Sequence, residues 1–544
     1  MLMKGARAYI VLTLVFTALM SLPFLVEGAG WTALFGLVPL LEMEYISHRD
    51  GTRHFWLWSY LALVLWNAVT TWWVGNATVG GAVFAVLANA LQMELVFAAF
   101  RFVRRRTGGA FPYIFLAAAW IAWERYYLAA AEISWPWLVL GNAFAGTTSL
   151  AQWYEYTGHL GGSLWVWMSN LAIFDMLHFF RDGRWKAFNI PTKVFSVCSS
   201  AVFIIGPVVC SLALGAHLRG ESVDPVDVVI VQPDFDPYQK FQSMSQAQQN
   251  DVFIDLAEKG LSEFPDDSPV LVLAPETFTG DIVTSRIPQS PTFRTFQEFL
   301  HRHGNANILF GASTYDVADY RTSILAREYG DMWLTSHNSA IMTDSTGRHD
   351  LFHKSKLVVG TELTPYPRFF VPLENLLGGD LMGKCVGQDE VTTLDFRACG
   401  KSYTLGSVIC YESVYGEYCT QYVRKGAQLL AVITNDAWWG DSPGYRQHLN
   451  YSRLRAIETR RDIVRCANTG ISAFIDRKGN ITSASPWWER TVMTGKANLS
   501  DRETFFVRHG DFVGRISVFA AALLFLGALL RRGRNGNRKK EARR

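Results

Sequence analysis

The sequence is poor in charge: only 18% of its 544 residues are Asp, Glu, Lys or Arg, and the formal net charge is +3. So small an excess over so long a chain gives no support to nucleic-acid binding, which needs a concentrated basic face. Hydrophobic residues make up 49% of the chain, and the mean hydropathy is +0.10. Because this is too apolar for a wholly soluble chain, we expect a membrane-embedded part joined to a globular part.

Cysteine is also scarce, with seven in the whole chain, and no internal repeat or low-complexity tract appears apart from a basic C-terminal tail. Cys198 and Cys210 fall in an apolar run, and an odd number lies beyond it. At least one thiol there must stay unpaired. Outside the cytoplasm Cys385 and Cys399 are a conceivable disulfide, although sequence does not fix connectivity. The remaining three are Cys410, Cys419 and Cys466.

Long apolar runs predict about eight transmembrane helices, since about 20 residues cross a hydrocarbon core of ~30 Å. The second run is the shortest and ends in Glu42 and Glu44. A cleaved signal peptide is the alternative for the first run, but it lacks a small-residue cleavage site and more spans follow it. The runs lie near residues 6–26, 31–46, 55–74, 79–100, 110–131, 160–180, 194–217 and 512–530.

The positions of Lys and Arg predict the orientation of these spans, because short basic connections stay in the cytoplasm. Basic residues flank the first span and follow the second, fourth and sixth, whereas the loops near residues 27–30, 75–78 and 132–159 contain none. An even number of spans and a basic tail place both termini inside. We therefore expect four parts: a seven-helix region at 1–217, an extracytoplasmic catalytic domain at 218–511, a last helix at 512–530 and a cytoplasmic tail at 531–544.

Within the outer domain, short aliphatic runs alternate with polar helical stretches, which predicts an α/β sandwich. The sequence MTDSTGRHD carries the turn residues of a hairpin, and FIDRKGNIT repeats that design near residue 478. The expected strands lie at 226–232, 268–275, 306–313, 337–344, 403–410 and 427–434.

Three of these strand ends carry a reactive side chain: Glu276 in LAPET, Lys354 in FHKSKL and Cys410 in SVICYES. Each residue alone is weak evidence, because a strand-end Cys is more often a small buried hydrophobe. The ordered triple in these contexts resembles the carbon–nitrogen hydrolase (nitrilase) superfamily, which implies an αββα sandwich with a Glu-Lys-Cys triad.

With the predicted spans added, the whole chain resembles the bacterial apolipoprotein N-acyltransferase family. Further matching stretches are WPWLVLGNAF, VQPDFDPYQKF, HKSKLVVGTE, NDAWWGDSPGYRQHL and RCANTGISAFID. One departure is Phe241, where the family has Trp, so that an aromatic platform is kept but the indole N–H is lost.

The resemblance assigns roles that chemistry can check. Cys410 is the expected nucleophile, and Glu276 is the base that takes its proton. Lys354 places its ammonium beside the oxygen that becomes anionic in each tetrahedral intermediate. Lys356 is the competing register, but Lys354 has the family's spacing to a second acidic residue, Glu362, eight residues on.

Supporting and substrate-binding residues are expected around this triad. Glu362 orients Lys354 or supports Glu276, Glu412 holds the turn after Cys410, and Tyr411 helps to line the cavity. The expected substrate contacts are Phe241, Trp439 and His448.

Two further groups of charges are open to a structural or a functional interpretation. Glu124 and Arg125 lie inside the fifth span, where charges are functional by default, although Arg125 is near enough to the outer end to snorkel. The arginines that follow His448 on a predicted helix, paired at i, i+3 and i+4 with Glu458 and Asp462, indicate a solvated face. They are Arg453, Arg455, Arg460, Arg461 and Arg465.

The resemblance implies an N-acyltransferase of the bacterial inner membrane that faces the periplasm and needs no cofactor or metal. It would move an acyl chain from a phospholipid, usually phosphatidylethanolamine, through a Cys410 thioester to the α-amine of a diacylglyceryl-cysteine lipoprotein. A membrane-tethered nitrilase-type amidase is the first alternative. A non-enzymatic transporter is the second, and the spans show no repeated halves or broken helices in its favour.

Overall fold

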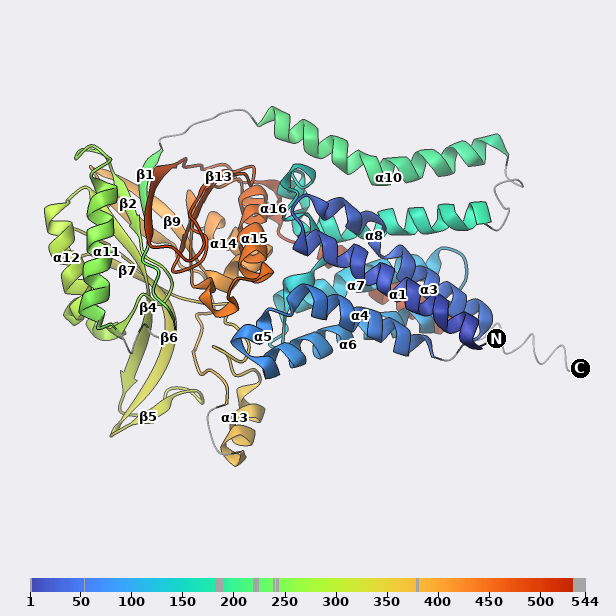
Figure 1. The fold of residues 1–544 in the computed structure, drawn as a ribbon, viewed down its shortest axis with the longest axis horizontal. Helices are drawn as coiled ribbons and strands as arrows, with labels where there is room; N and C mark the ends of the chain where they lie inside the picture. Colours follow the sequence, from blue (N-terminus) through green and yellow to red (C-terminus); the bar gives the residue numbers. More distant parts are fainter. Residues whose placement is uncertain are drawn as a thin grey trace, which may run out of the picture. The chain divides into compact units, whose positions relative to one another are not determined.

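The computed structural model describes residues 2–52, 54–181, 189–218, 225–237, 240, 244–377 and 381–531. The chain divides into two compact units. One comprises Met1–Ala131, Trp135–His217 and His509–Arg544, and the other comprises Glu132–Ser134 and Leu218–Arg508. Figure 1 shows the first as long helices and the second as packed sheets and helices.

The helical unit contains eight longer helices in its described part, together with short turns of helix. The longer helices are α1 (Leu2–Leu25), α3 (Val38–Asp50), α4 (Phe55–Thr71), α6 (Val79–Arg104), α7 (Phe111–Ala129), α8 (Tyr154–Arg181), α10 (Ile190–His217) and α17 (Phe512–Leu530). The short ones are η1 (Ala29–Thr32), α2 (Ala33–Gly36), α5 (Val74–Ala77), η2 (Pro136–Leu138), η3 (Leu140–Phe144) and η4 (Thr148–Leu150).

Each predicted apolar run contains a helix, and four described helices are both long and apolar enough to cross a membrane by themselves. These are α1, α6, α10 and α17, with mean hydropathies between 1.8 and 2.2. The others are shorter or more polar: α3, for example, has 13 residues and carries Glu42 and Glu44. A membrane-embedded unit is thus supported, whereas the count of about eight spans remains a prediction.

Glu124 and Arg125 connect elements of the helical unit. Glu124 is fully buried on α7 and accepts hydrogen bonds from the Trp120 indole at 3.0 Å and the Leu140 N–H at 2.8 Å. Arg125 pairs with Asp511 at 3.5 Å, immediately before α17. Both placements favour a structural interpretation, in which Glu124 anchors η3 and Arg125 ties α7 to α17.

The second unit is built on two β-sheets. The larger has the order β14-β1-β2-β4-β6-β5, with β3 beside β4 and β7 beside β6, and the smaller has the order β13-β12-β11-β10-β9-β8. The strands of the larger sheet are β1 (Val226–Gln232), β2 (Val270–Leu273), β3 (Thr279–Val283), β4 (Ala306–Ala318), β5 (Arg327–Tyr329), β6 (Met332–Asp344), β7 (His349–His353) and β14 (Thr491–Ala497). Those of the smaller are β8 (Leu394–Ala398), β9 (Lys401–Ile409), β10 (Leu429–Thr434), β11 (Ile463–Ala467), β12 (Ala473–Ile475) and β13 (Ile481–Ala484).

Helices cover the outer face of each sheet, while the two sheets contact each other through β1 with β11 and β6 with β9. Figure 1 shows α11 (Gln246–Leu261) and α12 (Pro291–Arg302) against the larger sheet, and α14 (Gly416–Arg424) and α15 (Pro443–Thr459) against the smaller one. This arrangement confirms the predicted αββα sandwich. The remaining segments are α13 (Pro367–Leu376), α16 (Phe505–His509), η5 (Thr284–Gln289), η6 (Cys410–Val414) and η7 (Asp436–Trp439).

The burial of these strands and helices follows from the pattern of apolar residues in their sequences. Every residue of β1 is buried, as expected for a strand covered on both faces. The apolar face of α12 comprises Phe293, Phe296 and Phe299 at helical spacing, and the Ser290 side chain caps its first turn. All six strands named from the sequence are present, and the predicted hairpins join β6 to β7 and β12 to β13.

The interpretation of the arginines that follow His448 as the solvated face of one helix is wrong. The helix α15 ends at Thr459, so that Arg460, Arg461 and Arg465 lie beyond it. Arg455, Arg460, Arg461 and Arg465 are among the largest fully buried side chains. Their charges are satisfied internally: Arg455 pairs with Glu458 at 2.9 Å, and Arg461 donates to the Ala427 carbonyl at 2.8 Å. Because α15 is buried nearly all round, the spacing that would suit an exposed ion-paired face serves interior pairs instead.

The cysteines of this unit differ in environment, and all of them are free thiols. Cys385 and Cys399 do not form the conceivable disulfide: Cys399 is exposed, with its sulfur 3.1 Å from the Asp267 carbonyl. Cys466 on β11 donates toward the Val231 carbonyl of the facing sheet at 3.3 Å. Cys466 and Cys419 are buried, and Cys410 is the described cysteine whose thiol interacts with both Glu276 and Lys354.

Candidate active site

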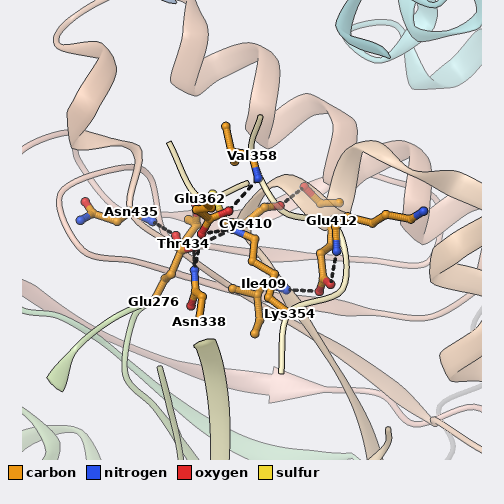
Figure 2. A network of polar contacts seen from close by, with 12 residues as sticks. Glu276, Asn338, Lys354, Val358, Glu362, Ile409, Cys410, Glu412, Thr434 and Asn435 are labelled. Carbon is orange, nitrogen blue, oxygen red and sulfur yellow. Dashed lines mark hydrogen bonds and ion pairs between the residues drawn. The ribbon is translucent and has the colours of Figure 1, made fainter. Parts of the chain in front are cut away.

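Glu276, Lys354 and Cys410 come together in the sandwich although they lie far apart in the sequence. Glu276 follows β2, Lys354 follows β7 and Cys410 follows β9, so each side chain stands directly beyond the end of a strand. Figure 2 shows all three in one cluster with Glu362 and Asn338. All three are buried: their exposed fractions are 6%, 1% and 8%.

The Lys354 ammonium is held between two carboxylates. Its Nζ lies 3.0 Å from Glu276 Oε1 and 3.0 Å from Glu362 Oε1. Burial opposes the charged form, but Glu276 and Glu362 outweigh it and raise the pKa of Lys354 well above its ordinary value. Lys354 is therefore a permanent cation, and Lys356 makes neither contact: its Nζ lies 5.3 Å from the centre of the Tyr415 ring.

Asn338 belongs to this cluster, and the sequence interpretation missed it. Its Nδ2 donates to Glu276 Oε1 at 2.7 Å and to Glu362 Oε1 at 2.6 Å, and its main-chain carbonyl accepts the main-chain N–H of Lys354 at 2.8 Å. The Asn338 side-chain amide therefore bonds both of the carboxylates, Glu276 and Glu362, that also contact the Lys354 ammonium. Asn338 lies within β6, and the sequence around it predicts a strand but nothing about catalysis. An Asn at this position therefore could not be recognised as part of a site.

The backbone turn that presents Glu276 is tightly constrained. The Asn435 N–H donates to Glu276 Oε2 at 3.1 Å, and Thr277 adopts a φ of 47°. Gly311 on β4 runs so close that a Cβ there would lie 2.6 Å from Glu276 Cα, which only glycine permits. The backbone of the turn and the carboxylate that it carries are thus both held in place before any substrate arrives.

Cys410 occupies a strained elbow between β9 and η6. Its φ is 51°, a left-handed conformation that costs a non-glycine residue about 1–3 kcal/mol and persists only when its surroundings enforce it. Burial and the negative charge of Glu276 raise the pKa of the Cys410 thiol well above its ordinary value, and Lys354 offsets only part of this. The resting sulfur is therefore protonated and needs a base.

Glu412 ties the Cys410 elbow to the loop that follows Lys354. Its Oε2 accepts the Ile409 N–H at 2.8 Å, and its Oε1 accepts the Ser355 N–H at 2.7 Å and the Tyr418 hydroxyl at 2.7 Å. Glu412 is fully buried. Its placement fits the expected role in holding the turn at Cys410.

The other residues named from the sequence lie in different environments. Tyr411 is buried beside Cys410, with its hydroxyl 3.4 Å from the Ser134 carbonyl and its ring edge-to-face with Tyr415. Trp439 lies on η7 with its ring edge-to-face on His448. Phe241 lies outside the described residues.

His448 is fully buried and contacts the main chain of the elbow, so its placement favours a structural role over the expected substrate contact. Its Nε2 lies 3.0 Å from the Cys410 carbonyl, and its Nδ1 lies 2.9 Å from Asp436 Oδ1. Cys410, Asp436 and His448 present possible metal ligands within 4.8 Å of one another. However, Arg465 already lies 2.6 Å from the other Asp436 oxygen, and a guanidinium at that position disfavours a second cation.

Lys240 is a second buried lysine near Glu276 that the sequence interpretation overlooked. Its ammonium donates to the Thr277 carbonyl and lies 5.9 Å from the centre of the Phe278 ring. Burial lowers the pKa of Lys240 to about 7, although Glu276 opposes the shift. A lysine in VQPDFDPYQKF resembles any surface lysine, so only its contacts reveal its position.

Taken together, the cluster offers a nucleophile, a base and a fixed cation. This set suits acyl transfer through a covalent thioester, because the base activates the thiol and the cation stabilises the oxyanion. Water and amines are both chemically competent to resolve such an intermediate.

Comparisons with known proteins find matches to both parts of the chain. Residues 225–505 match the carbon-nitrogen hydrolase family, and residues 16–172 match the apolipoprotein N-acyltransferase N-terminal domain. A protein of Chlorobaculum tepidum named apolipoprotein N-acyltransferase is 28% identical over 93% of this chain and 92% of its own length. One of the same name from Geobacter metallireducens is 26% identical, also over 93% and 92%.

A solved structure, the nitrilase-superfamily protein Nit3 of Saccharomyces cerevisiae, is 16% identical, covers 52% of this chain and 92% of its own, and has a TM-score of 0.37. A score this low adds nothing to the assignment. The family match covers more than half of the chain, and the relatives extend it through the apolar helical unit. The chain therefore belongs to the carbon–nitrogen hydrolase family and is a membrane-bound acyltransferase that shares its helical and catalytic parts with apolipoprotein N-acyltransferases.

Proposed function

We propose that this protein transfers a fatty acyl chain from a phospholipid, through a thioester on Cys410, to the α-amine of the N-terminal diacylglyceryl-cysteine of lipoproteins. The observation that carries the proposal is the end-to-end similarity to proteins named apolipoprotein N-acyltransferase, across both the apolar helices and the thiol site. A thiol enzyme anchored in a bilayer can take its acyl group from the lipid itself and needs no soluble carrier.

In the first half-reaction Glu276 takes the Cys410 proton as the sulfur attacks the ester carbonyl of the phospholipid. The Lys354 ammonium stabilises the oxyanion of the tetrahedral intermediate, a contribution worth about 10²–10³-fold for one donor. The C–O bond then breaks, and the leaving alkoxide takes the proton from Glu276. Lysophospholipid departs and Cys410 holds the acyl group.

In the second half-reaction the α-amine attacks the thioester carbonyl. An α-amine has a pKa of about 8, so part of it is already neutral at physiological pH. Glu276 accepts a proton from the attacking nitrogen, the C–S bond breaks, and that proton returns to the sulfur. The products are an amide and the original thiol, and exclusion of water protects the intermediate.

Supporting roles follow from the contacts. Glu362 orients the Lys354 ammonium through the 3.0 Å pair and shares Asn338 with Glu276. Glu412 holds the elbow, and Tyr411 and Trp439 line the approach to Cys410. Phe241 would contact substrate in the segment after Lys240.

Orientation and location complete the proposal. The distribution of Lys and Arg supports a catalytic domain at 218–511 on the periplasmic face of the inner membrane, between a helical region at 1–217 and a last helix at 512–530, with the tail at 531–544 in the cytoplasm. Phosphatidylethanolamine is the proposed donor.

A reconstituted assay tests the function. Purified protein in phosphatidylethanolamine vesicles receives a synthetic peptide beginning with diacylglyceryl-cysteine, and mass spectrometry follows both products. We expect one added acyl chain on the peptide and a matching amount of lysophospholipid. The same peptide with an acetylated α-amine should receive none. Release of free fatty acid without peptide acylation would contradict the proposal and favour an amidase-like hydrolase.

A further inference from the structure

Beneath the Cys410 elbow lies a group of three buried polar side chains, two of them charged, that come from three different elements. Arg465 belongs to β11, Asp436 begins η7 after β10, and His448 lies on α15. All three have an exposed fraction of 0%. Buried charges are costly unless they are paired, so this group requires an explanation.

The three side chains form one hydrogen-bonded network, in which Arg465 Nη2 also lies 3.1 Å from His448 Nδ1, and the network ends on the main chain of Cys410. Arg465 Nη2 lies 2.6 Å from Asp436 Oδ2, and Asp436 Oδ1 lies 2.9 Å from His448 Nδ1. His448 Nε2 then lies 3.0 Å from the Cys410 carbonyl oxygen. A carbonyl oxygen only accepts, so Nε2 carries the hydrogen of that contact.

Asp436 is kept ionised at the centre of this network. Burial opposes its ionisation, yet the Arg465 guanidinium and the His448 imidazole hold the pKa of Asp436 at about 2. The Thr434 hydroxyl adds a hydrogen bond to Oδ1 at 2.9 Å. A permanent carboxylate fixes the orientation of the imidazole and thereby of its Nε2–H.

The contact to Cys410 bears on the strained part of the elbow. The Cys410 carbonyl accepts a second hydrogen bond, from the Ser413 hydroxyl at 2.8 Å. Two donors fix the peptide plane between Cys410 and Tyr411. In a trans peptide the N–H points opposite to the C=O, so fixing the carbonyl toward His448 turns the Tyr411 N–H the other way.

We propose that Arg465, Asp436 and His448 act as a positioning unit, which holds the Cys410 peptide so that the thiol faces Glu276 and Lys354 and the Tyr411 N–H faces the developing oxyanion. The unit touches no substrate atom. It replaces the substrate-contacting role expected for His448 and gives a function to two side chains outside the triad. This inference rests on the proposed thioester chemistry of Cys410.

Two amide substitutions of His448 separate positioning from simple packing. In His448→Gln the amide reaches the place of Nε2 and keeps a donor for the Cys410 carbonyl, whereas in His448→Asn it reaches only the place of Nδ1. We expect His448→Asn to lower kcat for acyl transfer by about 10²-fold with KM unchanged, as a small misplacement of a reacting group does. His448→Gln should recover much of that loss.

Arg453→Gln is the matched control, because Arg453 is buried on the same helix but donates to the Gly479 carbonyl at 2.8 Å, away from the elbow. It should keep the wild-type kcat even if it lowers thermal stability. Equal loss of kcat in His448→Asn, His448→Gln and Arg453→Gln would overturn the proposal, as would full kcat in His448→Asn.

A second variant and a second measurement cover the case in which the His448 variants do not fold. Ser413→Ala removes one donor to the Cys410 carbonyl and, with it, the 2.9 Å contact of the same hydroxyl with His448 Nε2. It should lower kcat about 10-fold at constant KM, and an unchanged kcat would count against the positioning role. The rate of Cys410 alkylation by iodoacetamide, located by peptide mass spectrometry, should change in His448→Asn and not in Arg453→Gln. This measurement needs no acyl substrate, so it tests the positioning unit even if the proposed function fails.

Discussion

At the scale of single residues, the central feature is that Cys410, the proposed nucleophile, is protonated at rest. Cys410 is buried beside a carboxylate, and both effects raise its pKa well above the ordinary value. The positive charge of Lys354 is already balanced by the carboxylates of Glu276 and Glu362, each 3.0 Å from its Nζ. The sulfur therefore becomes a thiolate only as Glu276 removes its proton during attack.

Alkylation by iodoacetamide should reveal this raised pKa. A free thiol ionises near pH 8.5, so the alkylation rate of glutathione levels off just above that pH, whereas the rate for Cys410 should still be rising. Glu276→Gln removes the negative charge that raises the pKa of Cys410. It should move the Cys410 inflection to lower pH while abolishing acyl transfer. A Cys410 inflection below that of glutathione would contradict a thiol that is neutral at rest.

Asn338→Asp should be strongly inactivating. The substitution removes two buried hydrogen bonds to carboxylates, at 2.7 Å and 2.6 Å, and places a third acidic group around Lys354. Bonds to charged groups are worth about 1.5–3 kcal/mol each, so we expect kcat to fall by at least about 10²-fold.

Asn307→Asp makes the same chemical change in the same sheet, at a buried side chain that donates to the Arg397 carbonyl at 2.8 Å. This control should cost stability and leave kcat near the wild-type value. Steady-state acyl transfer and thermal unfolding of both variants provide the comparison, and equal kcat values would argue against a special role for Asn338.

Sequence alone could select Glu276, Lys354 and Cys410 as candidates because each follows a strand in a distinctive context, and the structure brings the three together. It could not identify Asn338, since an Asn within a strand carries no mark of what it faces. His448 was assigned to the substrate for the same reason: a histidine on a helix near the site has the same appearance whether its imidazole faces the cavity or the interior. Only the three-dimensional structure shows which way the imidazole faces.

At the scale of elements, strand β9 ends directly before Cys410 and packs against α14. Gly406 makes this possible: a Cβ there would lie 2.7 Å from Leu430 Cδ2 and 2.8 Å from Tyr422 Cβ. Tyr422 in turn lies on α14 and donates to Glu412, which holds the elbow. The packing of β9 and the geometry of Cys410 are therefore linked.

Gly406→Ala should destabilise the protein by about 1–3 kcal/mol, the usual cost of overpacking a core, and lower acyl transfer through Tyr422. Gly280→Ala in β3 is the control, because its added Cβ would meet nothing within 4 Å. Thermal unfolding of the full chain in detergent measures both. Equal midpoints for the two variants would contradict the close packing of β9.

The sequence predicted the positions of the named strands and apolar helices better than it predicted the burial of α15. Buried aliphatic runs such as β1 and β10 have few alternative interpretations, and the hairpin turns carry Asp and Gly at the positions where tight turns favour them. The helix α15 was misread because an i, i+3 pair such as Arg455 with Glu458 has the same spacing on an exposed face and in an interior. Burial of so many arginines depends on carbonyls and carboxylates from other elements, which no local pattern contains.

At the scale of the whole molecule, the proposal requires the catalytic unit to face away from the cytoplasm. Cys399 provides a natural probe, since its thiol is exposed and free. A membrane-impermeant maleimide added to spheroplasts should label Cys399, and Cys399→Ser should lose that label. Labelling that appears only after lysis would reverse the proposed orientation.

The mass of the intact protein tests the central claim most directly. Protein purified from its membrane should carry an added fatty acyl chain on Cys410, and neutral hydroxylamine, which cleaves thioesters, should remove it. Cys410→Ala should never carry the adduct. The account would be contradicted by an adduct on another cysteine, by one that survives hydroxylamine, or by full acyl transfer in Cys410→Ala.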